Sequence, residues 1–168
     1  MIRICGMVLL VLSVSGIGWM RASELRQRPR ALRGMIEALS LLRDDIAARA
    51  MPLPDALAHV GGVSGGNSGE FLISTAYKLQ HSDRIFREIW ESEVQTLPFL
   101  SREDRGTISQ LGKHLGVVYA VSQERAMDTC LHALERAEQE ALSRAGQFGR
   151  LYAGLGMTLG TMLAVVLY

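Results

Sequence analysis

The chain has 168 residues, and its 18 Lys and Arg nearly balance its 17 Asp and Glu, which leaves a formal net charge of +1. This length supports a single domain with a modest hydrophobic core. Only two cysteines are present, Cys5 and Cys130. They fall in different parts of the chain, so a disulfide framework is excluded.

Two uncharged apolar segments lie at the ends of the chain and enclose a charged middle. Residues 4–20 are bounded by Arg3 and Arg21, and residues 151–168 follow Arg150. A membrane-spanning helix needs about 17 to 25 apolar residues, so both segments are just long enough. The pattern predicts a transmembrane helix over 4–20, a helical domain over 21–150 and a second transmembrane helix over 151–168.

Basic residues after the first predicted span set its orientation. Those that follow it closely are Arg21, Arg26, Arg28, Arg30 and Arg33. The positive-inside rule therefore places the domain in the cytosol and both termini outside. The cluster lies so near the membrane that contact with lipid headgroups is a better interpretation than nucleic-acid binding. A cleavable signal peptide over residues 1–22 is the competing interpretation of the first segment.

The domain itself is predicted to be helical almost throughout. Pro29 suits the first turn of an amphipathic helix, and its apolar face comprises Leu32, Met35, Ile36, Leu39, Leu42 and Ile46. Residues 51–54 break this helix, and a short helix from Pro54 to about Val60 follows. The glycine-rich residues 61–69 are expected to form a mobile surface loop.

Further helices are expected in the second half of the domain. One contains Phe71, Leu72, Ala76 and Leu79; the next is capped by Ser82 or Asp83 and buries Ile85, Phe86, Ile89, Trp90 and Val94. Ser101 and Asp104 have the spacing of a capping box. A final long helix begins near Ser122, includes Leu142 in its apolar stripe, and runs towards Phe148 and the second span. The expected fold is an all-α bundle of about five to six helices flanked by transmembrane helices.

No pattern of catalytic, metal-binding or cofactor-binding residues emerges. Gly62 to Gly66 matches G-x-S-x-G, but the strand that a nucleophile elbow requires is missing. The four histidines lack metal-ligand spacing. Glu88, Glu91 and Glu93 form an acidic patch around Trp90, which is typical of a solvated helical face or a protein-binding surface.

Contacts with partners are expected at a few sites. Gly156 and Gly160 lie four residues apart in the second span, which favours close helix packing within one copy or between copies in a homo-oligomer. The candidate partner-binding residues are Arg28, Arg30, Arg33, Pro52, Pro54, Glu88 and Glu91.

The order of several short motifs resembles the stage III sporulation protein AB family of endospore-forming bacteria. The motifs are Arg28-Pro29 opening a helix, Pro52-Leu53-Pro54-Asp55-Ala56-Leu57, a helix around Trp90, Leu111-Gly112-Lys113-His114-Leu115-Gly116, and Tyr152-Ala153-Gly154-Leu155-Gly156 before the last apolar segment. The sequence departs from the family at Val117 to Tyr119, where a polar turn is usual. The resemblance covers essentially the whole chain.

The resemblance implies a non-enzymatic platform subunit of the complex that links the mother cell to the forespore, in the outer forespore membrane. The family is similar to one helical module of the inner-membrane platform protein of type II secretion machines. By that analogy, the expected partners are other stage III sporulation membrane proteins, the lipid bilayer and the stage III sporulation protein AA-type ATPase. A lipid- or envelope-binding membrane module is the alternative.

Overall fold

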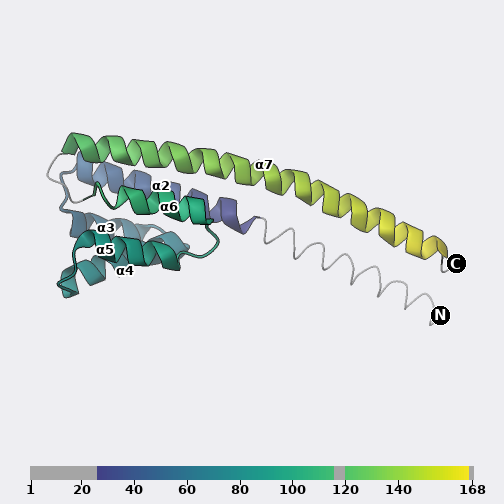
Figure 1. The fold of residues 1–168 in the computed structure, drawn as a ribbon, viewed down its shortest axis with the longest axis horizontal. Coiled ribbons are helices and arrows are strands. Elements are labelled where there is room, and N and C mark those ends of the chain that lie inside the picture. The colour runs from purple at the N-terminus through teal and green to yellow at the C-terminus, as the bar shows by residue number, and fades with distance from the viewer. Residues whose placement is uncertain (1–25, 116–119, 167–168) are drawn as a thin grey trace. The chain divides into compact units, whose positions relative to one another are not determined.

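A computed structural model describes residues 26–115 and 120–166, with 120–122 and 148–166 as backbone only (Figure 1). Within these ranges the chain forms helices and no strand, which confirms the predicted all-α class. The helices are α2 (Gln27–Ala47), α3 (Leu53–Val63), α4 (Gly66–His81), α5 (Phe86–Thr96), α6 (Arg102–Leu111) and α7 (Ala120–Val166).

The chain divides into two compact units. One unit is Arg28–Gln139, and the other combines Met1–Gln27 with Glu140–Tyr168. In the first unit, α3, α4 and α5 run up and down beside one another, while α2 and α6 lie beside the first part of α7 (Figure 1). Ion pairs join α2 to both of its neighbours: Arg28 pairs with Asp104 of α6, and Arg43 pairs with Asp128 of α7.

Trp90 is buried in this unit, as the sequence predicted. Its side chain is fully buried, and its ring meets Phe71 edge-on at a centroid distance of 4.9 Å. The indole N–H donates to the carbonyl of Ile108 at 2.8 Å, so this one side chain joins α4, α5 and α6. Gly112 packs against the indole so closely that a Cβ there would lie 2.2 Å from Trp90 Cδ1. A single large aromatic side chain thus fixes how three helices fit together.

The prediction of a mobile loop over residues 61–69 is wrong. Helix α3 continues to Val63 and α4 begins at Gly66, so only Ser64 and Gly65 separate the two helices. A Cβ on Gly61 would lie 2.9 Å from the backbone nitrogen of Ile73. The glycines therefore allow α3 and α4 to touch through their backbones, and this packing outweighs the low helix propensity of glycine.

The start of α5 also differs from the prediction. The helix begins at Phe86 after Ile85, with no side-chain cap, so neither Ser82 nor Asp83 caps it. Ile85, which was expected in the buried stripe, is 62% exposed because it precedes the first helical turn. The capping box at Ser101 and Asp104 is confirmed, with both reciprocal hydrogen bonds formed.

The break at residues 51–54 is confirmed, and so is the long final helix, which α7 continues without interruption to Val166. Leu142, expected to be buried, is 53% exposed. It lies about 80° around the helix from the buried Leu134, at the edge of the apolar stripe. The first predicted span, 4–20, lies outside the described residues. Among the residues that are described, no helix is sufficiently long and apolar to cross a bilayer.

Candidate partner-binding surface

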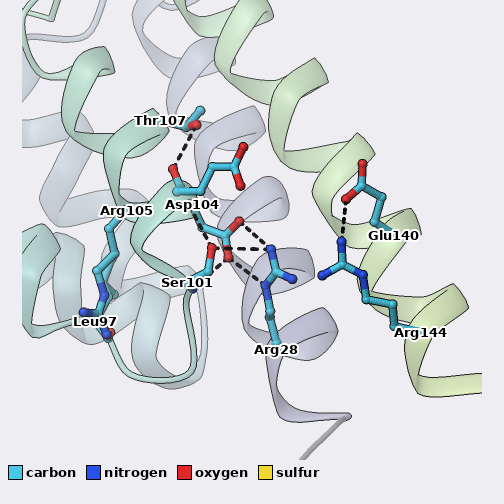
Figure 2. Close-up of polar contacts among 9 residues, drawn as sticks. Arg28, Leu97, Ser101, Asp104, Arg105, Thr107, Glu140 and Arg144 are labelled. Carbon is cyan, nitrogen blue, oxygen red and sulfur yellow. Dashed lines mark hydrogen bonds and ion pairs between the residues drawn. The ribbon is translucent and has the colours of Figure 1, made fainter. Parts of the chain in front are cut away.

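Arg28, a predicted partner contact, binds Asp104 of the same chain. Its guanidinium donates from Nε and Nη2 to the two carboxylate oxygens of Asp104, both at 2.9 Å, and Nη2 also lies 3.4 Å from Ser101 Oγ (Figure 2). The Asp104 side chain is 2% exposed and that of Arg28 is 26% exposed. The two side chains therefore anchor the first turn of α2 to the first turn of α6.

The electrostatics of this contact favour ionised Asp104. Burial by itself would raise the pKa of the carboxyl, but hydrogen bonds from Arg28 and from Ser101 outweigh burial and hold the pKa below its ordinary value. Asp104 also accepts from the Ser101 backbone N–H at 2.9 Å, which completes the capping box. The carboxylate is thus a structural anion at neutral pH and has no proton to donate.

The other two arginines of the predicted surface face solvent. Arg30 is exposed, and Arg33 pairs with Glu37 one turn along the same helix at 3.1 Å. Both side chains of that pair are more than half exposed. Arg30 and Arg33 are therefore available to a partner, whereas the charge of Arg28 is committed to Asp104.

Pro52 and Pro54 form the entry to α3, as the sequence suggested. Pro52 occupies the N-cap position and is exposed, while Pro54 is half-buried. The preceding turn is held by Asp45, whose carboxylate accepts from Arg49 at 2.8 Å and lies 2.7 Å from His59 Nδ1. This buried carboxylate fixes the position at which the chain leaves α2 and enters α3.

The predicted acidic patch around Trp90 is divided between two environments. Glu88 and Glu91 are exposed on α5, and Glu88 makes a 3.5 Å contact with Arg84. Glu93, in contrast, is buried against α4, where it accepts from Ser74 at 2.6 Å and from Lys78. Positions 88 and 91 share one face of the helix and position 93 lies on another, so the expectation of one continuous patch is wrong.

Glu93 is held as an anion by its neighbours. Burial would raise its pKa, but the hydrogen bonds from Lys78 and Ser74 prevail and lower it. The sequence analysis did not predict the contact of Glu93 with Ser74 and Lys78. The one available signal was the position of Glu93 on α5, beside the buried Val94 rather than on the exposed face. The sequence analysis likewise missed Ile73 and Tyr77 on α4, which are 48% and 62% exposed. Their spacing of four residues, away from the buried stripe, could have revealed a second apolar face.

Two of the predicted residues lie where only the backbone is described. Gly156 and Gly160 belong to the C-terminal part of α7, and their packing against another helix stays a prediction. In the described part of the chain, no three His, Cys, Asp or Glu side chains gather as a metal ion would require. Cys130 lies buried beside the Thr107 carbonyl, and burial raises its pKa to about 12.

Comparison with known proteins identifies the family. The sequence model described as stage III sporulation protein AB matches residues 3–168. The chain belongs to the stage III sporulation protein AB family. It is similar to stage III sporulation protein AB of Bacillus subtilis (strain 168), with 23% identity over 171 residues and 99% of each chain covered. The resemblance inferred from the sequence is confirmed.

A solved structure of a stage III sporulation protein AB has the same fold. It superimposes with a TM-score of 0.65 at 22% identity, covering 71% of this chain and 97% of the other. Since almost all of that solved chain is matched, this family fold is a helical bundle like the one described here. Membership also associates the chain with the other stage III sporulation proteins.

Proposed function

We propose that this member of the stage III sporulation protein AB family is a non-enzymatic platform subunit of the complex that links the mother cell to the forespore. Residues 4–20 and 151–168 anchor it in the outer forespore membrane. Its helical domain faces the mother-cell cytosol and docks a secretion-type ATPase, a protein of the stage III sporulation protein AA type. Family membership and the charge pattern of the chain support this role.

The observation that carries the proposal is that the buried carboxylates of the bundle are paired with basic side chains, whereas other charged side chains are exposed on its surface. Asp45, Glu93 and Asp104 are the buried carboxylates among the described residues, and each is held by a cationic partner. Glu93 and Asp104 stabilise contacts between helices, and hydrogen bonds hold the pKa of both carboxyls below the ordinary value despite burial. Acidic and basic side chains on the outer faces, including Glu91 and Arg30, remain available for a protein partner.

Charge reversal on α5 tests the docking step. We expect Glu88→Lys/Glu91→Lys to weaken co-purification of the co-expressed ATPase roughly tenfold, because two exposed attractions become repulsions. Glu70→Lys/Glu124→Lys is the matched control, since both residues are exposed on other helices and the net charge changes equally. Equal ATPase recovery with both folded double variants would reject α5 as the docking face.

Sidedness tests the anchoring step. A cysteine replaces Asp83, in the exposed turn between α4 and α5, in a Cys5→Ser background whose remaining cysteine, Cys130, is buried. A membrane-impermeant thiol reagent should label it only after the cells are lysed, because the positive-inside rule places the domain in the cytosol. Labelling in intact cells would place the domain on the opposite side of the membrane and rule out contact with a cytosolic ATPase.

A further inference from the structure

The buried face of α7 ends well before the helix does. The buried side chains described on this helix are Met127, Cys130, Leu131, Leu134 and Ala141. From Leu142 to Gln147 no side chain is buried, and only that of Ala145 is half-buried. The helix nevertheless continues to Val166. Residues 142–147 are therefore a stretch of α7 that has helical backbone hydrogen bonds but no buried face to stabilise it.

This stretch lies next to a boundary between the two compact units. The first unit ends at Gln139, and the second resumes at Glu140. Glu140 pairs with Arg144 at 3.4 Å, but both side chains are more than half exposed, and such a pair adds little stability (Figure 2). Ser143 Oγ donates to the Glu140 carbonyl at 2.9 Å, which competes with the helical hydrogen bond to the same oxygen. Side-chain contacts therefore do little to stiffen α7 at this boundary.

Gly146 lies within the stretch, and packing does not explain why it is glycine. It is exposed, and a Cβ there would meet nothing within 4 Å, whereas a Cβ on Gly112 would lie 2.2 Å from the Trp90 ring. Apart from proline, glycine is the residue that most disfavours helix. Gly106 of α6 is equally open, but the buried Asp104 and Ile108 hold its helix on both sides. Gly146 is thus a weak position in the least supported part of α7.

The other connection between the two units contains a helix boundary. Helix α2 begins at Gln27, and Arg26 before it lies in a turn. The first unit starts at Arg28, so this turn lies beside the other unit boundary of the chain. Each connection of the bundle therefore contains a place where the backbone can bend, either the turn at Arg26 or residues 142–147.

We infer that residues 142–147 form a flexible joint in α7 and that the helix bends at Gly146. Bending there changes the direction of the C-terminal part of α7, while the bundle of Arg28–Gln139 keeps its packing. Hinges are typically a few residues, often small ones, that absorb a change in backbone angles. The role of the joint rests on the function proposed above: in an anchored platform, it lets the helical domain follow a docked ATPase without disturbing the second predicted span.

Distances within α7 of the full chain test the joint. In a Cys5→Ser background, nitroxide labels are attached to cysteines that replace Gln139 and Ala153, one on each side of the joint. The control pair replaces Arg125 and Gln139, which are both exposed on the part of α7 that packs in the bundle. The members of each pair are 14 residues apart, which is about 21 Å along a helix. Cys130 stays unlabelled because its thiol is buried.

Pulsed electron paramagnetic resonance should give a distance distribution at least about twofold broader for the pair across the joint than for the control pair. Gly146→Ala should narrow the broad distribution towards the width of the control, because alanine favours helix most strongly. Gly146→Ala/Gln147→Gly returns a glycine to the joint one position further along and should restore the width. Gly106→Ala, which changes an equally exposed glycine on α6, should leave the width unchanged.

Amide hydrogen exchange reports on the joint without labels. In the wild type, the amides of residues 142–147 should exchange faster than those of residues 127–141, because no buried contacts must open with them. Gly146→Ala should slow exchange in the joint about fivefold, which corresponds to the difference of about 1 kcal/mol between glycine and alanine in a helix.

Two results would overturn the inference. Equal widths for the two label pairs would show that α7 is rigid through residues 142–147. A broad distribution that Gly146→Ala leaves unchanged would show that the helix does not bend at Gly146. Carbonate extraction of vesicles that contain the same protein tests the anchoring separately. Protein that washes off while the joint stays flexible refutes only the anchoring, whereas protein that resists extraction and gives equal widths refutes only the joint.

Discussion

Replacing Arg28 with alanine should destabilise the bundle because it leaves the buried Asp104 carboxylate without its cationic partner. The Asp104 carboxylate is 2% exposed and would lose both guanidinium bonds, keeping its hydrogen bonds from Ser101. Breaking a buried ion pair by removing one partner costs about 3–5 kcal/mol. Arg28 itself is 26% exposed, so water can replace part of its contact and we expect a loss of about 3 kcal/mol in the free energy of unfolding.

The loss should also depend on pH. In the wild type the pKa of folded Asp104 lies below that of the unfolded chain, so its stabilisation is complete above the unfolded pKa and is lost as pH falls through the folded pKa. Without Arg28, the pKa of folded Asp104 loses the hydrogen bonds that lower it most and rises relative to the wild type, because burial raises it and only Ser101 still lowers it. The folded variant then takes up its proton at a higher pH than the wild type does, and the stability difference between the two proteins should shrink as pH falls through the range between the two folded pKa values.

Guanidinium denaturation of the full chain in detergent micelles, followed by circular dichroism, measures both effects. Arg33→Ala is the matched control, because its ion pair with Glu37 on the same helix is exposed on both sides. That control should change stability by no more than about 0.5 kcal/mol at any pH. An Arg28→Ala loss as small as the control, or one that stays constant from neutral pH down to about pH 2.5, would refute the explanation that the variant leaves a buried carboxylate without its partner.

Three further predictions concern packing and reactivity. Gly69→Ala should lower stability in thermal melts by about 2–3 kcal/mol, because its Cβ would lie 2.0 Å from the Ser64 carbonyl oxygen. Gly62→Ala is the control: its Cβ would meet nothing within 4 Å, so stability should be unchanged or higher. Gly112→Ala should cost about 1–3 kcal/mol by displacing the Trp90 ring, and an unchanged near-ultraviolet circular dichroism spectrum would contradict this. Burial raises the pKa of Cys130 to about 12, so a thiol reagent at neutral pH should modify it only after denaturant unfolds the chain; modification of the folded protein, measured by mass spectrometry, would show that α7 opens locally.

Local signals in the sequence predicted the parts of the fold that local contacts determine. The capping box at Ser101 forms within one helical turn, and Trp90 lies on a strongly amphipathic helix, so each could be identified from spacing alone. The pairing of Arg28 with Asp104 spans 76 residues. No local pattern distinguishes those two side chains from other exposed charges on amphipathic helices, and only the packed bundle brings them together.

The glycine-rich segment shows how tertiary packing can override composition. Glycine disfavours helix by about 1 kcal/mol per residue, which made a loop the natural prediction for residues 61–69. The spacing held no contrary signal, because Gly61 and Gly69 lie on different helices and Gly65 lies in the turn between them. In the bundle, Gly61 and Gly69 let α3 and α4 meet at backbone distance, and burial of their neighbours offsets the cost.

The buried carboxylates explain how a bundle of similar leucine-rich helices acquires one arrangement. Two of them join helices through ion pairs, Asp104 between α6 and α2 and Glu93 between α5 and α4, while Asp45 contacts His59 of α3. A buried ion pair contributes little net stability, but an incorrect register would leave its charge unpaired at a cost of several kcal/mol. The pairs therefore select the native packing over other compact arrangements. A platform that presents one fixed surface to its partners depends on that selection.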